Sequence, residues 1–95
     1  MEIKDKLVEA IVKGIQEKKG QDITIADLRG IDGNIASYFV ICQGNSPSQV
    51  EAIADSVCET ARIEAGEKPV HTVGLPQAYW VAMDYVEVIV HVFIP

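Results

Sequence analysis

The sequence predicts an α/β fold in which a mixed sheet of about five strands packs against two main helices. Three observations support this fold. Apolar residues recur every fourth position near the N-terminus, a capped apolar helical pattern follows residue 46, and short β-branched or apolar runs fill most of the remaining chain. At 95 residues, the chain is expected to be one domain covering residues 1–95.

The first helix is predicted from Glu2 to Lys19. Its apolar stripe consists of Ile3, Leu7, Ile11 and Ile15. This spacing places the four side chains on one face of a helix. Lysines at the end suit the negative end of the helix dipole, and Gly20 is expected to take the left-handed position that follows.

Two strands are predicted before the second helix. The segment from Asp22 to Leu28 contains the β-branched run Ile23-Thr24-Ile25, and the turn formers that follow it are Arg29, Gly30, Asp32, Gly33 and Asn34. The run from Tyr38 to Cys42 is continuously apolar and too short for a helix. It is therefore expected to be a central strand that is covered on both faces.

The second helix has the clearest start signal in the chain. Ser46 is expected to be the N-cap, Pro47 the first helical residue, and Gln49 the third residue of a capping box. The residues expected to form its buried face are Val50, Ile53, Ala54, Val57, Cys58 and Ala61. The helix is expected to end near Gly66.

Three strands are predicted after this helix. Val70 to Val73 can form a short strand, and Gly74 to Pro76 a turn. Tyr79 to Asp84 and Glu87 to Phe93 lie close enough in the sequence to form a hairpin. The predicted order of elements is therefore α-β-β-α-β-β-β.

Charge and composition restrict the expected surroundings and partners. The net charge is −6, which repels phosphate and favours a basic protein surface over direct nucleic-acid readout. No apolar run is long enough to span a membrane, and the charges at the N-terminus do not suit a signal peptide, so a cytoplasmic protein is expected. Cys42 and Cys58 are interpreted as reduced core residues, with a disulfide between them as the alternative.

Nucleotide binding or nucleotidyl transfer is the alternative function. Gly44, Asn45 and Ser46 stand before a helix, where free amides can bind an anion. One glycine does not form a phosphate loop, however, and the only close carboxylate pair, Asp84 with Glu87, lacks the spacing of a two-metal site. Neither histidine stands in a recognisable catalytic or zinc pattern. No enzyme activity, metal or cofactor is therefore expected.

The predicted hairpin contains the candidate interaction residues. With a two-residue turn at Tyr85 and Val86, alternation places Trp80, Ala82 and Asp84 on one face, opposite His91, Ile89 and Glu87 in that order. Opposed carboxylates destabilise a hairpin, and an aromatic side chain among acidic groups is typical of an interface. The alternative is that Trp80 packs under a helix and the carboxylates only solubilise the turn.

Several motifs of the chain resemble the ribosomal silencing factor family (RsfS, Iojap). They are Asp22-Ile23 with Asp27-Leu28, Ser37 to Ser46, Gln49-Val50, Ala52 to Ala54, Pro69, Gly74, Ala78, Trp80-Val81, Asp84, and Val88 to Phe93. The resemblance implies a nucleotidyltransferase-like topology without the catalytic site. It also implies a factor that binds a basic protein on the intersubunit face of the large ribosomal subunit, blocks joining of the small subunit and commonly forms homodimers.

The resemblance also implies a set of partner-binding residues. The hairpin motif of the family falls on this chain's hairpin and favours the interface interpretation. The expected partner-binding residues are Trp80, Asp84, Tyr85, Glu87 and His91.

Two departures from the family pattern affect these expectations. Val86 stands where the family usually has glycine, and a β-branched residue tolerates positive φ poorly, so a longer or different turn is expected. The family pattern also usually continues beyond Pro95 with an acidic, aromatic and leucine-rich segment. Without that segment, an apolar edge that favours dimerisation or weakens binding is expected.

Overall fold

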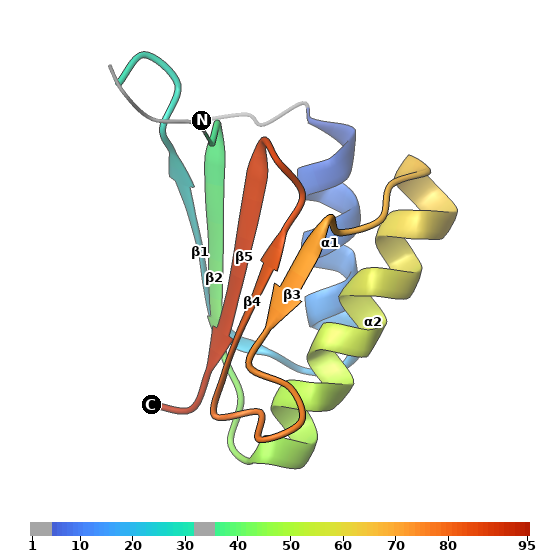
Figure 1. Cartoon of the computed structure of the whole chain (residues 1–95), viewed down its shortest axis with the longest axis vertical. Coiled ribbons are helices and arrows are strands. Elements are labelled where there is room, and N and C mark those ends of the chain that lie inside the picture. Colours follow the sequence, from blue (N-terminus) through green and yellow to red (C-terminus); the bar gives the residue numbers. More distant parts are fainter. Residues whose placement is uncertain (1–4, 32–35) are drawn as a thin grey trace.

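The computed structural model describes residues 5–31 and 36–95, and its elements follow the predicted order. The helices are α1 (Lys6–Glu17) and α2 (Pro47–Ala65), and the strands are β1 (Gln21–Asp27), β2 (Tyr38–Gln43), β3 (His71–Val73), β4 (Trp80–Asp84) and β5 (Val88–Phe93). Within these residues the fold is a mixed five-stranded sheet with two helices, which confirms the predicted fold class (Figure 1). The expected helix start at Glu2 and the turn formers Asp32, Gly33 and Asn34 lie outside the described residues.

Helix α1 begins later than predicted because Asp5 caps it. The Asp5 carboxylate accepts hydrogen bonds from the backbone N–H groups of Leu7 and Val8 at 2.9 and 3.1 Å. These bonds satisfy two of the amides that a helix start leaves without partners. Lys6 is therefore the first helical residue.

The C-terminal end of α1 uses a different residue from the one predicted. Lys19 takes the left-handed conformation with φ 60°, and the Gly20 N–H donates to the Ile15 carbonyl at 3.0 Å. A Cβ on Gly20 would overlap the Ile15 side chain. The prediction that Gly20 supplies the positive φ is therefore wrong, and glycine is needed there because the chain passes so close to Ile15.

Helix α2 starts and ends as predicted, with one change in its capping box. The Ser46 hydroxyl accepts from the Gln49 N–H at 3.2 Å, and Gly66 ends the helix with φ 67°. The Gln49 side chain accepts from the backbone N–H of Asn45, whereas a standard capping box would use that of Ser46. Its amide group also donates to the carbonyls of Lys18 and Lys19, and so connects the start of α2 to the end of α1.

The sheet has the strand order β1-β2-β5-β4-β3, with β2 and β5 parallel and the other neighbours antiparallel. The predicted β4–β5 hairpin is confirmed. Strand β2 is an interior strand, but β5 occupies the centre. Side chains of β2 alternate between buried and half-buried, because both helices pack on the same side of the sheet (Figure 1). The prediction that both faces of β2 are covered is therefore wrong.

The core lies between the helices and one face of the sheet. Its largest fully buried side chains are Ile11, Ile15, Ile53, Met83, Val8, Val40, Val50, Val57, Val81, Val88, Val90 and Val92. Cys42 belongs to this core, where burial raises the pKa of its thiol to about 11, and it is not bonded to the half-buried Cys58. No helix in the described part of the chain is both long and apolar enough to cross a membrane.

Candidate docking face on the open side of the sheet

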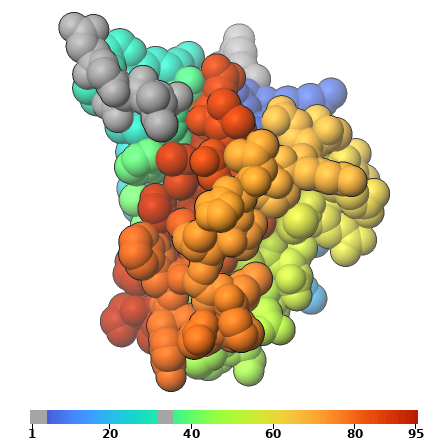
Figure 2. Space-filling model, viewed as in Figure 1, coloured from blue at the N-terminus to red at the C-terminus, as the bar shows by residue number. Residues whose placement is uncertain are grey.

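The side of the sheet away from the helices forms a continuous face, called here the open face. Strand register places the following residues on it: Thr24 and Ala26 of β1, Phe39, Ile41 and Gln43 of β2, Ile89, His91 and Phe93 of β5, Trp80, Ala82 and Asp84 of β4, and His71 and Val73 of β3. In Figure 2, no helix lies over the orange and red strands β4 and β5. Within residues 5–31 and 36–95, no helix therefore covers the open face (Figure 2).

Most of the open face is apolar. The side chains of Phe39, Ile41, Ile89 and Phe93 are half-buried because they cover one another, whereas Trp80 is 60% exposed. None of the strand residues on this face is lysine or arginine. A large exposed aromatic residue beside an apolar surface is typical of a protein interface.

Trp80 is held by His91 on the neighbouring strand. Its direct partner across the β4–β5 pair is Phe93, while His91 lies opposite the small Ala82. The indole reaches diagonally across the strand pair, where its Nε1–H donates to His91 Nδ1 at 3.2 Å. The two rings are nearly parallel, with an interplanar angle of 17° and centroids 5.8 Å apart.

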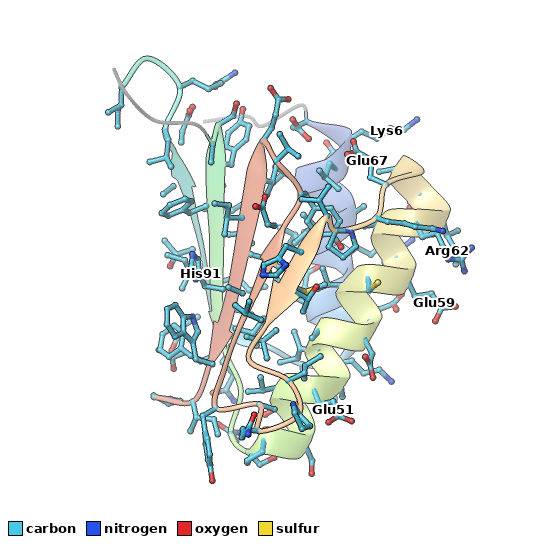
Figure 3. The ribbon with its side chains drawn as sticks, in the orientation of Figure 1. Lys6, Glu51, Glu59, Arg62, Glu67 and His91 are labelled. Carbon is cyan, nitrogen blue, oxygen red and sulfur yellow. The ribbon has the colours of Figure 1, made fainter. Side chains whose placement is uncertain are left out.

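His91 is also packed against β2. The Phe39 ring meets the imidazole edge to face, with centroids 5.4 Å apart. Burial lowers the pKa of His91, because a low-dielectric site disfavours the charged imidazolium. Figure 3 shows His91 on the side of the sheet away from Glu51, Glu59 and Arg62 of α2. At neutral pH the face therefore presents an uncharged imidazole beneath the indole.

The loop between β3 and β4 fixes where Trp80 begins its strand. Gly74 has φ 100°, and a Cβ at this position would overlap the carbonyl oxygen of Trp80. The Ala78 N–H donates to the Gly74 carbonyl at 2.9 Å, which closes the loop. Glycine is therefore needed for both the backbone conformation and the close approach to Trp80.

The β4–β5 turn differs from the predicted one by two residues of register. Asp84 lies opposite Ile89, and the Tyr85 N–H donates to the Val88 carbonyl, so the turn residues are Val86 and Glu87. The prediction that Asp84 faces Glu87 is therefore wrong. Instead, the Asp84 carboxylate accepts from the Val86 N–H at 2.7 Å, and Glu87 is exposed at the tip.

Tyr85 lies on the opposite side of the sheet from Trp80. Its side chain is only 3% exposed, and its hydroxyl has no hydrogen-bond partner among the described residues. Burial raises the pKa of this hydroxyl. Of the predicted partner-binding residues, Trp80, Asp84 and His91 therefore share the open face, Glu87 borders it, and Tyr85 belongs to the core.

The start of α2 is occupied by its own contacts. The Ser46 hydroxyl and the Asn45 N–H are both bonded to Gln49. A Cβ on Gly44 would lie 2.9 Å from the Val50 side chain, so this glycine is required by helix packing. Among the described residues, no group of three or more His, Cys, Asp or Glu is placed to hold a metal ion.

Phe39, Ile41 and Phe93 are not among the predicted site residues, although they form the apolar floor around His91. The parallel pairing of β2 with β5 brings them together. Local periodicity carries no signal of which distant strands pair. The one available signal is the uninterrupted apolar run of β2. Because the side chains on both faces of that strand are apolar, the face away from the helices is also expected to contact other apolar groups.

The chain matches a family model described as "Ribosomal silencing factor during starvation" over residues 1–95. A curated ribosomal silencing factor RsfS of Halalkalibacterium halodurans is 38% identical over 87 residues, which are 92% of this chain and 73% of the relative. The RsfS of Bacillus subtilis is 42% identical over 77 residues, which are 81% of this chain and 64% of the relative. The chain thus spans roughly two thirds to three quarters of these relatives.

Solved structures show the same architecture. A crystal structure of a Chromobacterium violaceum protein superposes with a TM-score of 0.87 at 30% identity and covers 100% of this chain and 77% of that one. A crystal structure from Bacillus halodurans has a TM-score of 0.80 at 34% identity and covers 93% of this chain and 80% of that one. Sequence and fold therefore agree.

Proposed function

The chain belongs to the ribosomal silencing factor family, and on that premise we propose that it docks through its open face on a basic protein of the large ribosomal subunit. The bound domain then occupies space that the small subunit needs, which represses translation. The action is steric, so it needs no catalytic residue, metal or cofactor. It is expected to take place in the cytoplasm, where ribosomes work.

The exposure of Trp80 is the observation that carries this proposal. The side chain is 60% exposed in a chain with a single tryptophan, yet its position is fixed by the bond to His91. A preorganised aromatic side chain loses little conformational entropy when a partner covers it. Tryptophan is also the residue type most enriched among side chains that dominate binding energy.

The charge of the molecule supports a basic protein as partner. Asp84 and Glu87 border the apolar floor, the strands of the open face carry no lysine or arginine, and the net charge is −6. Such a surface repels the phosphates of ribosomal RNA and attracts lysine and arginine side chains. The partner is therefore proposed to be a protein, with no direct readout of nucleic acid.

Self-association is part of the same proposal. An apolar sheet face that is uncovered in the free protein can be covered by a second copy, which would produce a homodimer. Because dimer formation and docking would then use one face, the free protein and the ribosome-bound protein would differ in oligomeric state.

Sedimentation through sucrose gradients with purified ribosomal subunits tests the proposal. The protein should co-sediment with large subunits, and its addition before small subunits should reduce the peak of joined ribosomes. Large-subunit RNA stripped of its proteins is the control and should not bind. Absence from the large-subunit fraction, or an unchanged peak of joined ribosomes with the protein bound, would contradict the proposal.

A further inference from the structure

The hydrogen bond between Trp80 and His91 can exist in only one protonation state of the imidazole. The indole Nε1–H is a donor without acceptor capacity, so His91 Nδ1 must offer its lone pair. A protonated imidazole carries hydrogens on both nitrogens and has no lone pair to offer. Protonation therefore replaces an attraction between the two rings by two N–H groups that face each other.

The surroundings of His91 contain little to compensate an added charge. From β2 it is faced by Phe39, Ile41 and Gln43, and from β4 by Ala82, Trp80 and Asp84. Beyond these strands, β1 contributes Thr24 and Ala26, and β3 contributes His71 opposite Asp84. Asp84 is the only carboxylate among these strand residues, and it lies diagonally from His91, where it favours the imidazolium only modestly. Burial acts in the other direction and lowers the pKa of His91.

We propose that His91 is a pH-dependent latch for the Trp80 indole: the neutral imidazole holds the indole across the open face, and the protonated imidazole releases it. The latch is closed above the pKa of His91 and opens as the pH falls through it. Because burial lowers that pKa, the latch stays closed until the pH is below the ordinary histidine value of about 6.5.

Release has a consequence for docking, which rests on the function proposed above. An indole that is free to rotate must be immobilised again when the partner binds, and this weakens affinity. The added positive charge also lies on the face proposed to meet a basic protein. Both effects have the same sign, so docking should weaken as the pH falls.

The latch can be tested on the isolated protein, because the chain has one tryptophan and two histidines. Tryptophan fluorescence is measured across the acidic range while far-UV circular dichroism verifies that the fold persists. The wild type should show a transition with a midpoint below about pH 6.5. His71→Gln is the matched control, since His71 is exposed on β3, and it should keep the transition. His91→Gln should abolish it, because the glutamine carbonyl can accept from the indole N–H at every pH.

Three outcomes would overturn the latch: no transition while the protein stays folded, a transition that survives in His91→Gln, or one that disappears in His71→Gln. Proton NMR of the indole Nε1–H gives an independent measurement. Its resonance should shift and exchange faster with solvent below the fluorescence midpoint, and an unchanged resonance would contradict the latch.

A second arm measures binding to large subunits at neutral pH and below the midpoint. The wild type should weaken by about fivefold, the loss expected for one hydrogen bond, whereas His91→Gln should bind equally at both pH values. Equal weakening of the two proteins would overturn the link between latch and docking. If neither protein binds at any pH, the proposed function fails, while the fluorescence transition still decides whether the latch exists.

Discussion

Val86 stores backbone strain at the tip of the β4–β5 turn. Its φ is 76°, and the Glu87 N–H donates to the Tyr85 carbonyl at 3.0 Å, the bond of a γ-turn centred on Val86. A β-branched residue at positive φ is strained by about 1–3 kcal/mol. The sequence predicted a different turn for this reason. The structure keeps a tight turn, because the Asp84 carboxylate and the Tyr85–Val88 pair hold it on both sides.

Replacing Val86 by glycine should therefore stabilise the protein. Glycine adopts positive φ without steric cost, and the side chain lost is 57% exposed, so the variant should gain about 1 kcal/mol after the entropy cost of glycine. Urea denaturation measures the difference. Val70→Gly is the control, since Val70 is 66% exposed and does not have positive φ. A Val86→Gly variant that loses as much stability as Val70→Gly would show that the turn is not strained.

Single residues of the site show which inferences transfer from sequence. Alternation alone places Trp80, Asp84 and His91 on one side of the hairpin, and a register error of two residues preserves that side. In the predicted hairpin Tyr85 is a turn residue, so alternation assigns it to neither side. Tyr85 enters the predicted site only through the family resemblance, and the structure buries it in the core.

At the scale of elements, the contact between α1 and α2 depends on Gly14. A Cβ at this position would lie 2.9 Å from Val57 Cα and 3.0 Å from the Ser56 carbonyl oxygen. The Ser56 hydroxyl also donates to the Gly14 carbonyl at 2.8 Å. The three nearest obstacles are all backbone atoms of α2, which cannot move without shifting the helix.

Gly14→Ala should destabilise the protein although alanine is the better helix former. Alanine gains about 1 kcal/mol in helix propensity, but the overlap with α2 costs about 1–3 kcal/mol, and the rigid backbone places this cost at the upper end. The expected net loss is about 1–2 kcal/mol, measured as a lower urea midpoint. Gln16→Ala, at an exposed position of the same helix, should change stability by less than about 0.5 kcal/mol. Increased stability in Gly14→Ala would contradict the close packing of the helices.

Local chemistry explains which element boundaries are predictable. Ser46, Pro47 and Gly66 mark α2 because capping needs only neighbouring residues. The end of α1 is not predictable in this way. Lys19, and not Gly20, takes the left-handed position because Gly20 lies so close to Ile15. That contact depends on the path of the chain after the helix, which local sequence does not determine. The pairing of β2 with β5 is equally non-local.

At the scale of the whole molecule, the two sides of the sheet have different surroundings. One side carries both helices and the core, and the other carries Trp80 and an apolar floor bordered by acidic side chains. The number and order of elements could be predicted from the sequence, and alternation places Trp80, Asp84 and His91 together on one side of the hairpin. The extent of the open face could not be predicted from the sequence. It follows from the absence of a helix over β2 and β5 on that side in the described residues.

The affinity of the Trp80→Ala variant for purified large subunits tests the docking face most directly. If Trp80 is the anchor, its truncation should cost about 2 kcal/mol or more, which is about thirtyfold in Kd. Tyr79→Ala is the matched control, because Tyr79 is a 66% exposed aromatic residue outside the open face, and it should bind within about twofold of the wild type. A folded Trp80→Ala variant that binds as tightly as the wild type would contradict the account.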